Sequence, residues 1–530
     1  LGSGGGMEYP GITIIGDTRD SITLNQVIMH EVGHNWFYAI LGSNERAYPF
    51  LDEGINSYYE MQYMLSRYPE LELQDFMGAS EFFASLTDIE SIPYYQYYFI
   101  PYEIAAKMNF DQSSLLHSND YNMFNYFGIT YLKNAFALNY LKEYVDEKHM
   151  DEAMQNYYEQ WKFRHPYPED FRKSIEEKLD VEVSWFFDQL LPTTRKVDYK
   201  IKRVKGDSAF IVNSGNIQSP FVLDGIKDSK KTFSKWYEPI TDDAWVSIPN
   251  PTIDKLVIDD GYLTTDLYRK NNYYNLAGFN KKFEPLRLKF LFGLEDPSNT
   301  TIYYSPVAGW NNYNKTMAGL WLHSGILKKK RVEYQLLPMY GFGNNDLAGS
   351  ARFNVFFPLQ GGIFRNIDFS LSGVRYGYTT QSSFNRFTAG LDFLFDTPLA
   401  KNIFNTLHTR YTFASDMQYL LDEEQNPPYD YFYNLSYSHQ KKGRVNPYKL
   451  VADLESGPKY IKATLEAEYK LSYTTKGGLD IRAFLGKFIV NNNPSFIYDF
   501  SLSGRKGGQD YMFEHVFLNR FGNYPNDLFS

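Results

Sequence analysis

Residues 460–473 alternate strictly between apolar and polar side chains, and this two-residue period constrains the fold of the chain more than any other feature. Successive side chains of a β-strand point to opposite faces, so such a run forms a strand and not a helix. Residues 475–478 then supply a Thr-Lys-Gly-Gly turn, and 479–485 carry an apolar residue at every second position. The same alternation returns at 366–372 and 496–503. We therefore expect long antiparallel hairpins in the C-terminal half.

Two architectures produce this alternation in residues 272–530. In a transmembrane β-barrel, strands of about 9–11 residues alternate lipid-facing apolar with lumen-facing polar side chains. A soluble antiparallel sheet with one wet face gives the same pattern, usually in strands of about 5–6 residues. The long runs, and the 46 Tyr and 42 Phe of the chain, favour an outer-membrane-type β-barrel, which can be incomplete here. This interpretation predicts an extracytoplasmic protein in contact with the outer-membrane lipid of a Gram-negative cell.

The rest of the chain shows different patterns of apolar and polar residues. Residues 1–193 read as mostly helical after a short strand at 12–15, and 196–266 show short alternating runs separated by turns, typical of a small β-sandwich. With 530 residues, several domains are expected. The predicted fold class is therefore multidomain α+β, with a helical domain at 1–193, a β-sandwich at 196–266 and the long-stranded region at 272–530.

Two helices in the first part are expected to matter most. Ser21 or Thr23 can cap a helix that runs to Gly42, and a second helix runs from about Leu51 to Arg67. Further helical periodicity occurs at 128–145, 151–163, 167–179 and 182–191.

Composition excludes several classes of function. The net charge of −10 and the lack of a long basic run argue against nucleic acid as a partner. Cysteine is absent, which excludes disulfides, thiolate metal sites and cysteine nucleophiles. The chain starts at Leu1 without an initiator Met or a signal segment and stops at Ser530 soon after a strand-like run, so we expect a piece of a longer protein.

The strongest chemical motif is His-Glu-Val-Gly-His at residues 30–34. On a helix, His30 and His34 lie on one face and can bind one metal ion, while Glu31 can act as a base on a zinc-bound water. A catalytic zinc needs a third protein ligand and an open fourth position. Glu53, separated from His34 by 18 residues, can supply that ligand from the second helix, and Asn56 can support the ligand shell.

These residues resemble the aminopeptidase N family of gluzincin zinc metallopeptidases, whose motif is His-Glu-x-x-His, 18 residues and Glu. Leu-Asp-Glu-Gly at 51–54 and Trp-Phe at 36–37 also look like family segments, as does Gly5-Gly6-Met7-Glu8, although Tyr9 stands where the family has Asn. The resemblance covers 1–193, implies a thermolysin-like catalytic domain with one Zn²⁺, and extends to the β-sandwich.

The resemblance also implies residue roles. Glu8 would bind the free α-amino group of a peptide substrate, with Gly5, Gly6 and Met7 lining the same site. Tyr131, in a Tyr-x-Lys segment that ends in Asn134 and not in the family's Gly, would stabilise the oxyanion, with Tyr126 as a competitor. The expected activity is removal of N-terminal residues by water that zinc and Glu31 activate. There are two alternatives. One is a zinc endopeptidase, and the other is an outer-membrane β-barrel transport or assembly protein with an accessory peptidase-like domain.

Overall fold

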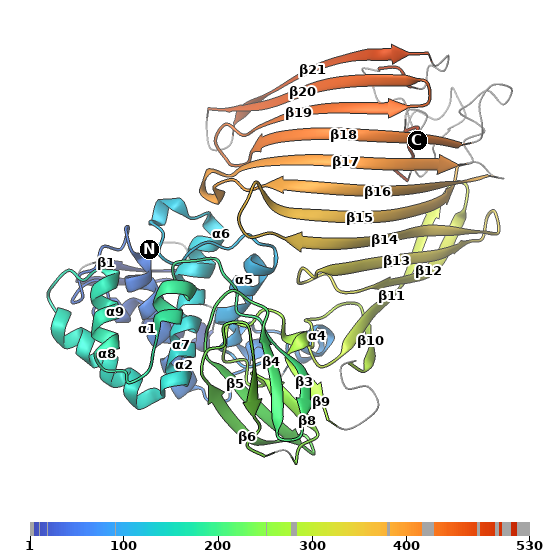
Figure 1. The fold of residues 1–530 in the computed structure, drawn as a ribbon. Coiled ribbons are helices and arrows are strands. Elements are labelled where there is room, and N and C mark those ends of the chain that lie inside the picture. Colours follow the sequence, from blue (N-terminus) through green and yellow to red (C-terminus); the bar gives the residue numbers. More distant parts are fainter. Residues whose placement is uncertain are drawn as a thin grey trace. The chain divides into compact units, whose positions relative to one another are not determined.

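The computed structural model describes most of the chain, in two compact units that are each considered by themselves (Figure 1). One unit comprises Leu1–Leu286 and Leu294–Thr300, and the other comprises Arg287–Gly293 and Thr301–Ser530. Among the described residues, no helix is both long and apolar enough to cross a membrane. The described residues are 5–9, 11–18, 20–90, 92–250, 252–276, 284–378, 382–415, 429–473, 477–492, 498–500 and 510–516.

The first unit begins with a small hairpin and then becomes helical. Strand β1 (Gly6–Tyr9) pairs antiparallel with β2 (Ile12–Ile15), which confirms the predicted strand. Its helices pack around one core in which Tyr98, Phe136 and Trp185 are almost fully buried. The helices and helical turns are α1 (Ser21–Gly33), η1 (Phe50–Gly54), α2 (Ile55–Arg67), α3 (Leu73–Phe76), α4 (Glu81–Thr87), α5 (Gln96–Lys107), η2 (Ser118–Asp120), α6 (Met123–Asn125), η3 (Tyr126–Lys133), α7 (Asn134–Val145), α8 (Glu147–Trp161), α9 (Pro168–Glu176) and η4 (Trp185–Leu190).

Helix α1 differs from the prediction at both ends. Asp20, and not Ser21 or Thr23, is the N-cap: its carboxylate accepts a hydrogen bond from Thr23 N at 2.7 Å. The helix ends at Gly33 and not at Gly42: residues 34–36 form a turn, and Tyr38 further along adopts φ 91° in the left-handed region. The second helix starts as a π-type turn, η1, and continues as α2 to Arg67, as predicted.

Two antiparallel sheets complete the first unit. One has the order β3-β4-β7, the other β6-β5-β8-β9, and their buried apolar faces belong to the same core as the helices. This arrangement agrees with a β-sandwich after residue 196, although both segments form one compact unit. The strands are β3 (Tyr199–Lys205), β4 (Ser208–Asn213), β5 (Phe221–Lys227), β6 (Lys230–Tyr237), β7 (Asp243–Ser247), β8 (Lys255–Ile258) and β9 (Tyr273–Asn275).

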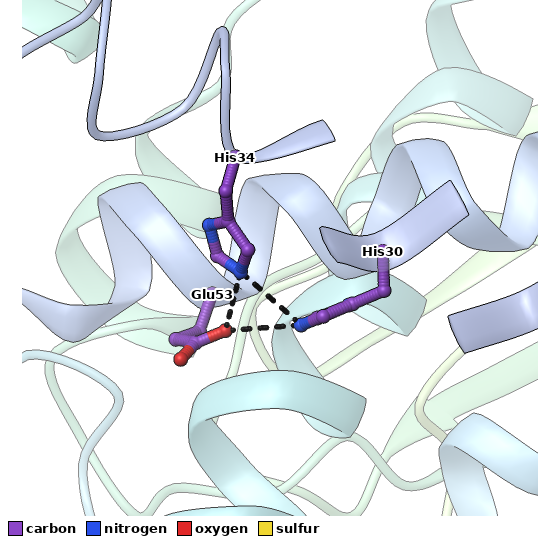
Figure 2. Close-up of side chains that lie close together, drawn as sticks. All are labelled: His30, His34 and Glu53. Carbon is purple, nitrogen blue, oxygen red and sulfur yellow. Dashed lines mark hydrogen bonds and ion pairs between the residues drawn. The ribbon is translucent and has the colours of Figure 1, made fainter. Parts of the chain in front are cut away.

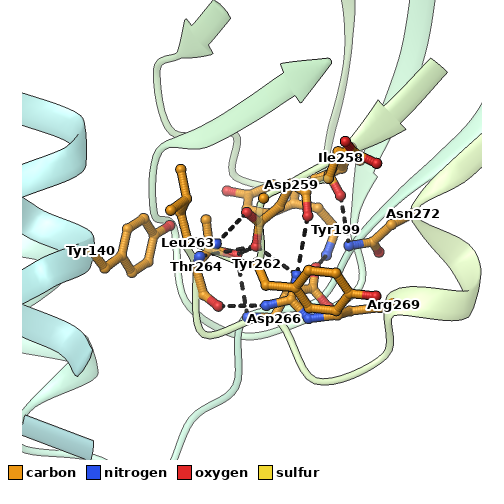
Figure 3. Close-up of polar contacts among 12 residues, drawn as sticks. Tyr140, Tyr199, Ile258, Asp259, Tyr262, Leu263, Thr264, Asp266, Arg269 and Asn272 are labelled. Atoms are coloured by element: carbon orange, nitrogen blue, oxygen red, sulfur yellow. Dashed lines mark hydrogen bonds and ion pairs between the residues drawn. The ribbon is translucent and has the colours of Figure 1, made fainter. Parts of the chain in front are cut away.

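A buried polar network fixes the loop that follows β8 (Figure 3). Asp259 accepts hydrogen bonds from the backbone N–H groups of Leu263 and Thr264, at 2.6 and 2.9 Å, and pairs with Arg269 at 2.7 Å. The same loop accepts a hydrogen bond from Gln96 Nε2, at the start of α5, through a backbone carbonyl at 3.0 Å. The network therefore ties the sheets to a helix that packs behind the site described below.

The second unit is built on one 12-stranded antiparallel sheet in which strands follow one another in sequence order, from β10 to β21. The predicted hairpin is confirmed as β20 and β21, with Leu465 opposite Leu485. The strands are β10 (Leu286–Phe290), β11 (Thr300–Asn311), β12 (Lys315–His323), β13 (Val332–Gly341), β14 (Asp346–Pro358), β15 (Phe364–Gly377), β16 (Ser383–Phe395), β17 (Ile403–Ser415), β18 (Tyr429–Lys441), β19 (Tyr448–Gly457), β20 (Tyr460–Ser472) and β21 (Gly478–Asn491).

Closure of this sheet into a barrel is not found. Among the described residues no pairing joins β10 to β21, so the sheet has two edges. The predicted turn at 475–478 and strand at 496–503 lie largely outside the described residues, and the described part of the latter, 498–500, is not a strand. The molecule is thus a mixed α+β multidomain protein with an extensive antiparallel sheet, and the barrel stays a prediction.

The two faces of the large sheet differ in chemistry and in exposure. The apolar face, which includes Phe353, Leu371, Phe387 and Tyr411, is open: these four side chains are 38–59% exposed. The polar face bears rows such as Arg352, Ser372, Thr388 and Thr412, which are neighbours across β14 to β17. Residues 510–516 pack on this polar face, where Phe513 stacks on Phe384 at 4.2 Å between ring centroids. The apolar side chains of this face are therefore open, while the polar face ranges from the buried Thr412 to the exposed Arg352.

Candidate active site

Helix α1 and the turn η1 bring the predicted metal ligands together. His30 lies in the last turn of α1, and His34 is its C-cap, with φ −64° and ψ −11° that are still helical. The i,i+4 spacing therefore holds, and both rings lie on the same side of the helix. Figure 2 shows the two imidazoles pointing at the carboxylate of Glu53, which η1 supplies.

The three ligand atoms form a compact triangle. Glu53 Oε2 lies 3.2 Å from His30 Nε2 and 3.3 Å from His34 Nε2, and the two nitrogens lie 3.3 Å apart. Atoms bound at about 2.0–2.1 Å to a tetrahedral zinc are separated by about 3.3–3.4 Å. Within the described ranges, this is the one group of His, Asp or Glu side chains close enough to hold a metal ion. The triangle therefore fits the spacing of three protein ligands that would hold one zinc ion.

Two further carboxylates, which sequence reasoning missed, hold the imidazole rings. His30 Nδ1 lies 2.9 Å from Glu60, and His34 Nδ1 lies 2.8 Å from Asp52. A hydrogen bond at Nδ1 leaves Nε2 for the metal and makes the ring a better ligand. Their positions offered a signal: Asp52 directly precedes Glu53, and Glu60 follows it by about two helical turns.

Glu60 is itself held by neutral donors. Gln26 Nε2 donates to Glu60 Oε1 at 2.6 Å, and the buried hydroxyl of Tyr98, on α5, donates to the same oxygen. Asn56, predicted to support the ligand shell, acts through the backbone: its Nδ2 donates to the carbonyl oxygen of His30 at 2.7 Å. The metal ligands are thereby fixed by α2 and α5 as well as by their own helix.

Opposing effects set the charges of the ligands. Burial lowers the pKa of His30, but hydrogen bonds to Glu53 and Glu60 outweigh it and raise that pKa to about 10. For His34, burial is likewise outweighed by Asp52 and Glu53, and its pKa rises to about 11. Burial also raises the pKa of Glu53, yet the two imidazoles reverse this effect and hold it well below its ordinary value. The site is therefore built for an ionised carboxylate and a cation, and a divalent metal would replace the protons on the rings.

Glu31 lies beside this centre in a confined position. Its side chain is buried, and Oε2 has no hydrogen-bond partner among the described residues. Burial is the main reason that the pKa of Glu31 rises to about 7, opposed by the charge of His30 and assisted by that of Glu8. A general base works best with a pKa near the working pH. Gly6 leaves room for it, since a Cβ on Gly6 would lie 2.0 Å from Glu31 Oε1.

One cleft of about 1070 Å³ contains the ligands, Glu31 and the predicted substrate-binding residues. Glu8 lies in β1 opposite Thr13 of β2, and its backbone oxygen accepts a hydrogen bond from the Tyr38 hydroxyl at 3.1 Å. The strand is thus fixed at the edge of the cleft, which is also lined by Gly5, Gly6, Met7 and Glu8.

Tyr131 reaches the same centre from η3. Its hydroxyl donates to Glu53 Oε1 at 2.5 Å, and its ring stacks on that of His30 with 5.8 Å between centroids. Burial and the charge of Glu53 raise the pKa of Tyr131 far above its ordinary value, so the hydroxyl stays a proton donor. Tyr126, the competing candidate, also lines the cleft, with its ring 6.0 Å from that of Tyr131. In the described part of the chain, Tyr131 is the tyrosine whose hydroxyl donates a hydrogen bond to a candidate metal ligand.

The comparisons with known proteins concern this same part of the chain. Residues 3–190 match the family described as "Peptidase family M1 domain". The N-terminal part of the chain is a peptidase M1 domain. Since M1 peptidases depend on zinc, it belongs to the zinc metallopeptidase class, in agreement with the ligand triangle. The resemblance to the aminopeptidase N family is thereby confirmed for this domain, while the match ends at residue 190 and does not extend to the large sheet.

A weaker similarity extends beyond the M1 domain. Aminopeptidase A of Gloydius brevicauda is 25% identical over 246 residues, which cover 44% of this chain and 23% of that protein. The chain therefore spans less than a quarter of the length of this relative.

Proposed function

We propose that the chain is a zinc aminopeptidase that removes N-terminal residues from peptides with a free α-amino group. The observation that carries the proposal is the ligand triangle of His30, His34 and Glu53 in one cleft with Glu8 and Glu31. A metallopeptidase of this class needs three ligands, a base and a site for the substrate terminus, and this cleft contains a candidate for each.

The roles follow from the positions of the side chains. Zinc held by the triangle supplies Lewis-acid chemistry, polarising a carbonyl and lowering the pKa of water towards about 7. Glu31 takes the proton of the attacking water and delivers it to the leaving amine. Tyr131, kept protonated by burial beside Glu53, donates its hydroxyl hydrogen to the oxyanion that develops on the scissile carbonyl.

Glu8 accounts for the choice of the N-terminal bond. An ammonium group that enters a partly dry cleft needs a carboxylate partner, and an internal peptide segment has no ammonium to offer. Because β1 is fixed by its pairing with β2 and by Tyr38, Glu8 is held at a constant place beside Glu31. The first peptide bond is therefore the one presented to the base.

The test is hydrolysis of a panel of aminoacyl reporter substrates by the purified chain, with and without a chelator. We expect chelator-sensitive activity that Glu31→Gln reduces by at least about 100-fold while zinc content stays at one per chain. Glu70→Gln, which changes an exposed glutamate outside the cleft, is the matched control and should keep full activity. Full zinc-dependent activity in Glu31→Gln would refute the base.

Substrates with a blocked N-terminus distinguish an aminopeptidase from a zinc endopeptidase. Glu8→Ala should chiefly reduce cleavage of a free-amino dipeptide, and N-acetylation of that dipeptide should have a similar effect on the native enzyme. If the acetylated peptide is cleaved as fast as the free one, the protein is a zinc endopeptidase and Glu8 does not bind the α-amino group of the substrate. If no substrate is cleaved and no zinc is bound, the domain is an accessory to the large sheet.

We also propose that the large sheet meets the lipid of a Gram-negative outer membrane, which would make the peptidase a membrane-attached, extracytoplasmic enzyme. A soluble sheet buries its apolar face, whereas here Phe353, Leu371 and Phe387 are open. An open apolar face of this length is expected where hydrocarbon replaces water outside the sheet.

Co-flotation with lipid vesicles tests this proposal. The chain should float with vesicles and resist extraction by carbonate, and Phe387→Asp, on the apolar face, should weaken that association. Thr388→Asp, the next residue and on the polar face, is the matched control and should float as the native chain does. A native chain that stays soluble without detergent or lipid would contradict the proposal.

A further inference from the structure

The polar face of the large sheet contains a second cavity, which lies wholly within the second unit. Its volume is about 670 Å³, and its walls come from strands β12 to β19 together with Met512 and Glu514. Hydroxyl groups form much of its floor, contributed by Ser350, Ser370, Ser372, Thr388, Thr412 and Ser436. Such a lining is suited to a polar ligand and not to an apolar one.

Three arginines project into this cavity: Arg352 from β14, Arg386 from β16 and Arg410 from β17. Among the described residues, no carboxylate lies within ion-pair distance of any of them. Arginines elsewhere on the sheet behave differently, because Arg375 pairs with Asp346 at 2.6 Å and Arg365 pairs with Asp396 at 2.5 Å. Unpaired guanidinium groups are thus concentrated in the cavity.

The donors of these arginines are also largely unused. A guanidinium offers five N–H donors, yet the described protein engages only Arg352 Nε, with Asn354 at 3.1 Å, and Arg386 Nη1, with the Phe513 carbonyl at 2.8 Å. Arg386 Nε is buried without any partner there. A buried, unsatisfied charged donor is costly, so Arg386 Nε calls for an acceptor from outside the described chain. Arg352 and Arg410 are exposed, and their free donors face the solvent of the cavity.

The carboxylates of the cavity have other partners. Asp392 binds His408 Nδ1 at 2.5 Å, and Glu455 accepts hydrogen bonds from the Tyr460 and Tyr511 hydroxyls, both at 2.6 Å. Lys462 adds an ion pair with Glu455 at 3.1 Å. Asp453 and Glu514 also line the cavity, and Glu514 interacts with Arg386 through its charge without forming an ion pair among the described residues. Asp392 interacts with Arg352 and Arg410 through its charge, but no ion pair among the described residues occupies the three guanidinium groups, so their free donors are available to a ligand.

The strand register places the three arginines around one region of the polar face, centred on Thr388. Arg352 and Thr388 lie two strands apart in one row, and Arg386 is two residues along β16 from Thr388. Arg410 lies opposite Gly390, on the other side of the same row. With strands about 4.8 Å apart and a rise of about 3.4 Å per residue, the Cα atoms are separated by about 12–16 Å. Extended arginine side chains can approach a shared ion from three sides over such distances.

We propose that this cavity is a binding site for a phosphate group, either free or carried by a larger ligand such as a lipid headgroup. A tetrahedral phosphate presents oxygens in several directions, so three guanidinium groups can each donate to it, and the hydroxyl floor can donate as well. A planar carboxylate is satisfied largely by one bidentate arginine and makes less use of three.

The experiment is titration calorimetry of the full chain in detergent with inorganic pyrophosphate. Loss of one charge-assisted arginine contact should weaken binding by about 10- to 100-fold in Arg410→Gln. Arg410→Lys keeps the positive charge but loses the paired N–H donors of the guanidinium group. It should weaken binding less than Arg410→Gln does. Arg482→Gln, which changes an exposed arginine on β21 outside the cavity, is the matched control and should bind as the native chain does. Peptidase activity and the melting temperature report whether each variant is folded.

Competition then identifies the source of the phosphate. Phosphatidic acid in the micelles should displace pyrophosphate if the natural ligand is a headgroup, and should leave its affinity unchanged if the ligand is free phosphate. Either result supports the site. The proposal is overturned if pyrophosphate gives no saturable binding to the native chain, if folded Arg410→Gln binds it equally well, or if succinate binds as tightly.

Discussion

The contact between Gly6 and Glu31 gives a sharp prediction, because it joins the predicted substrate strand directly to the predicted base. A methyl group at residue 6 would lie 2.0 Å from Glu31 Oε1 and 2.3 Å from its Cγ, whereas ordinary contacts begin at 3.4 Å. Rotation of the carboxylate alone cannot relieve an overlap with Cγ, so Gly6→Ala has to displace the base or the strand by about 1 Å. A misplacement of about 1 Å can cost about 100-fold in rate, or about 2.7 kcal/mol of transition-state stabilisation.

The assay is kcat/KM on the best aminoacyl reporter substrate, with zinc content measured in parallel. Gly6→Ala should lose about 100-fold in kcat/KM with one zinc retained, because the ligand triangle does not touch residue 6. Gly128→Ala is the matched control, since its Cβ would meet no atom closer than 3.4 Å. In a Glu31→Ala background the further loss from Gly6→Ala should nearly vanish, because the base is already absent. Gly6→Ala with more than half of the native kcat/KM would refute this account of the base.

Three further predictions concern residues that hold or assist the site. Glu60→Gln removes the charged partner of His30 Nδ1 and should weaken zinc binding by about 10- to 100-fold, measured by competition with a chelator; an unchanged zinc affinity would count against this role. Tyr131→Phe should lower kcat by about 100- to 1000-fold with zinc content preserved, and an equal loss through KM alone would contradict an oxyanion role. Arg269→Met leaves the buried carboxylate of Asp259 uncompensated and should lower the free energy of unfolding by about 3–5 kcal/mol in urea denaturation; a loss below about 1 kcal/mol would show that the pair is dispensable.

Local spacing made the grouping of His30, His34 and Glu53 predictable. His30 and His34 are four residues apart, and helical geometry alone then puts both rings on one face. Glu53 follows at a distance that lets one helix end and the next begin, and the structure brings its carboxylate to both rings. The long hairpin of β20 and β21 was equally predictable from the sequence, because a period of two over a dozen residues fits only a strand.

Interactions between segments far apart in the sequence were not predictable in this way. Tyr98 donates to Glu60 across 38 positions of the chain, and Asp52 reaches His34 across 18. The early end of α1 was also missed, because the apolar run that continues past Gly33 has no stop signal before Gly42. Each of these depends on how the backbone turns after a local element ends.

By itself, the sequence determined which side chains share a face: the paired imidazoles of one helix, and the apolar and polar rows of each long strand. Only the tertiary structure decided what lies against those faces. The alternation in residues 460–473 is the same whether water or hydrocarbon meets the apolar row, and in the structure Leu465, Tyr469 and Leu471 of that row are open. The physical reason is that periodicity is a property of a single strand or helix, whereas burial and charge pairing are set by the neighbours that folding brings to it.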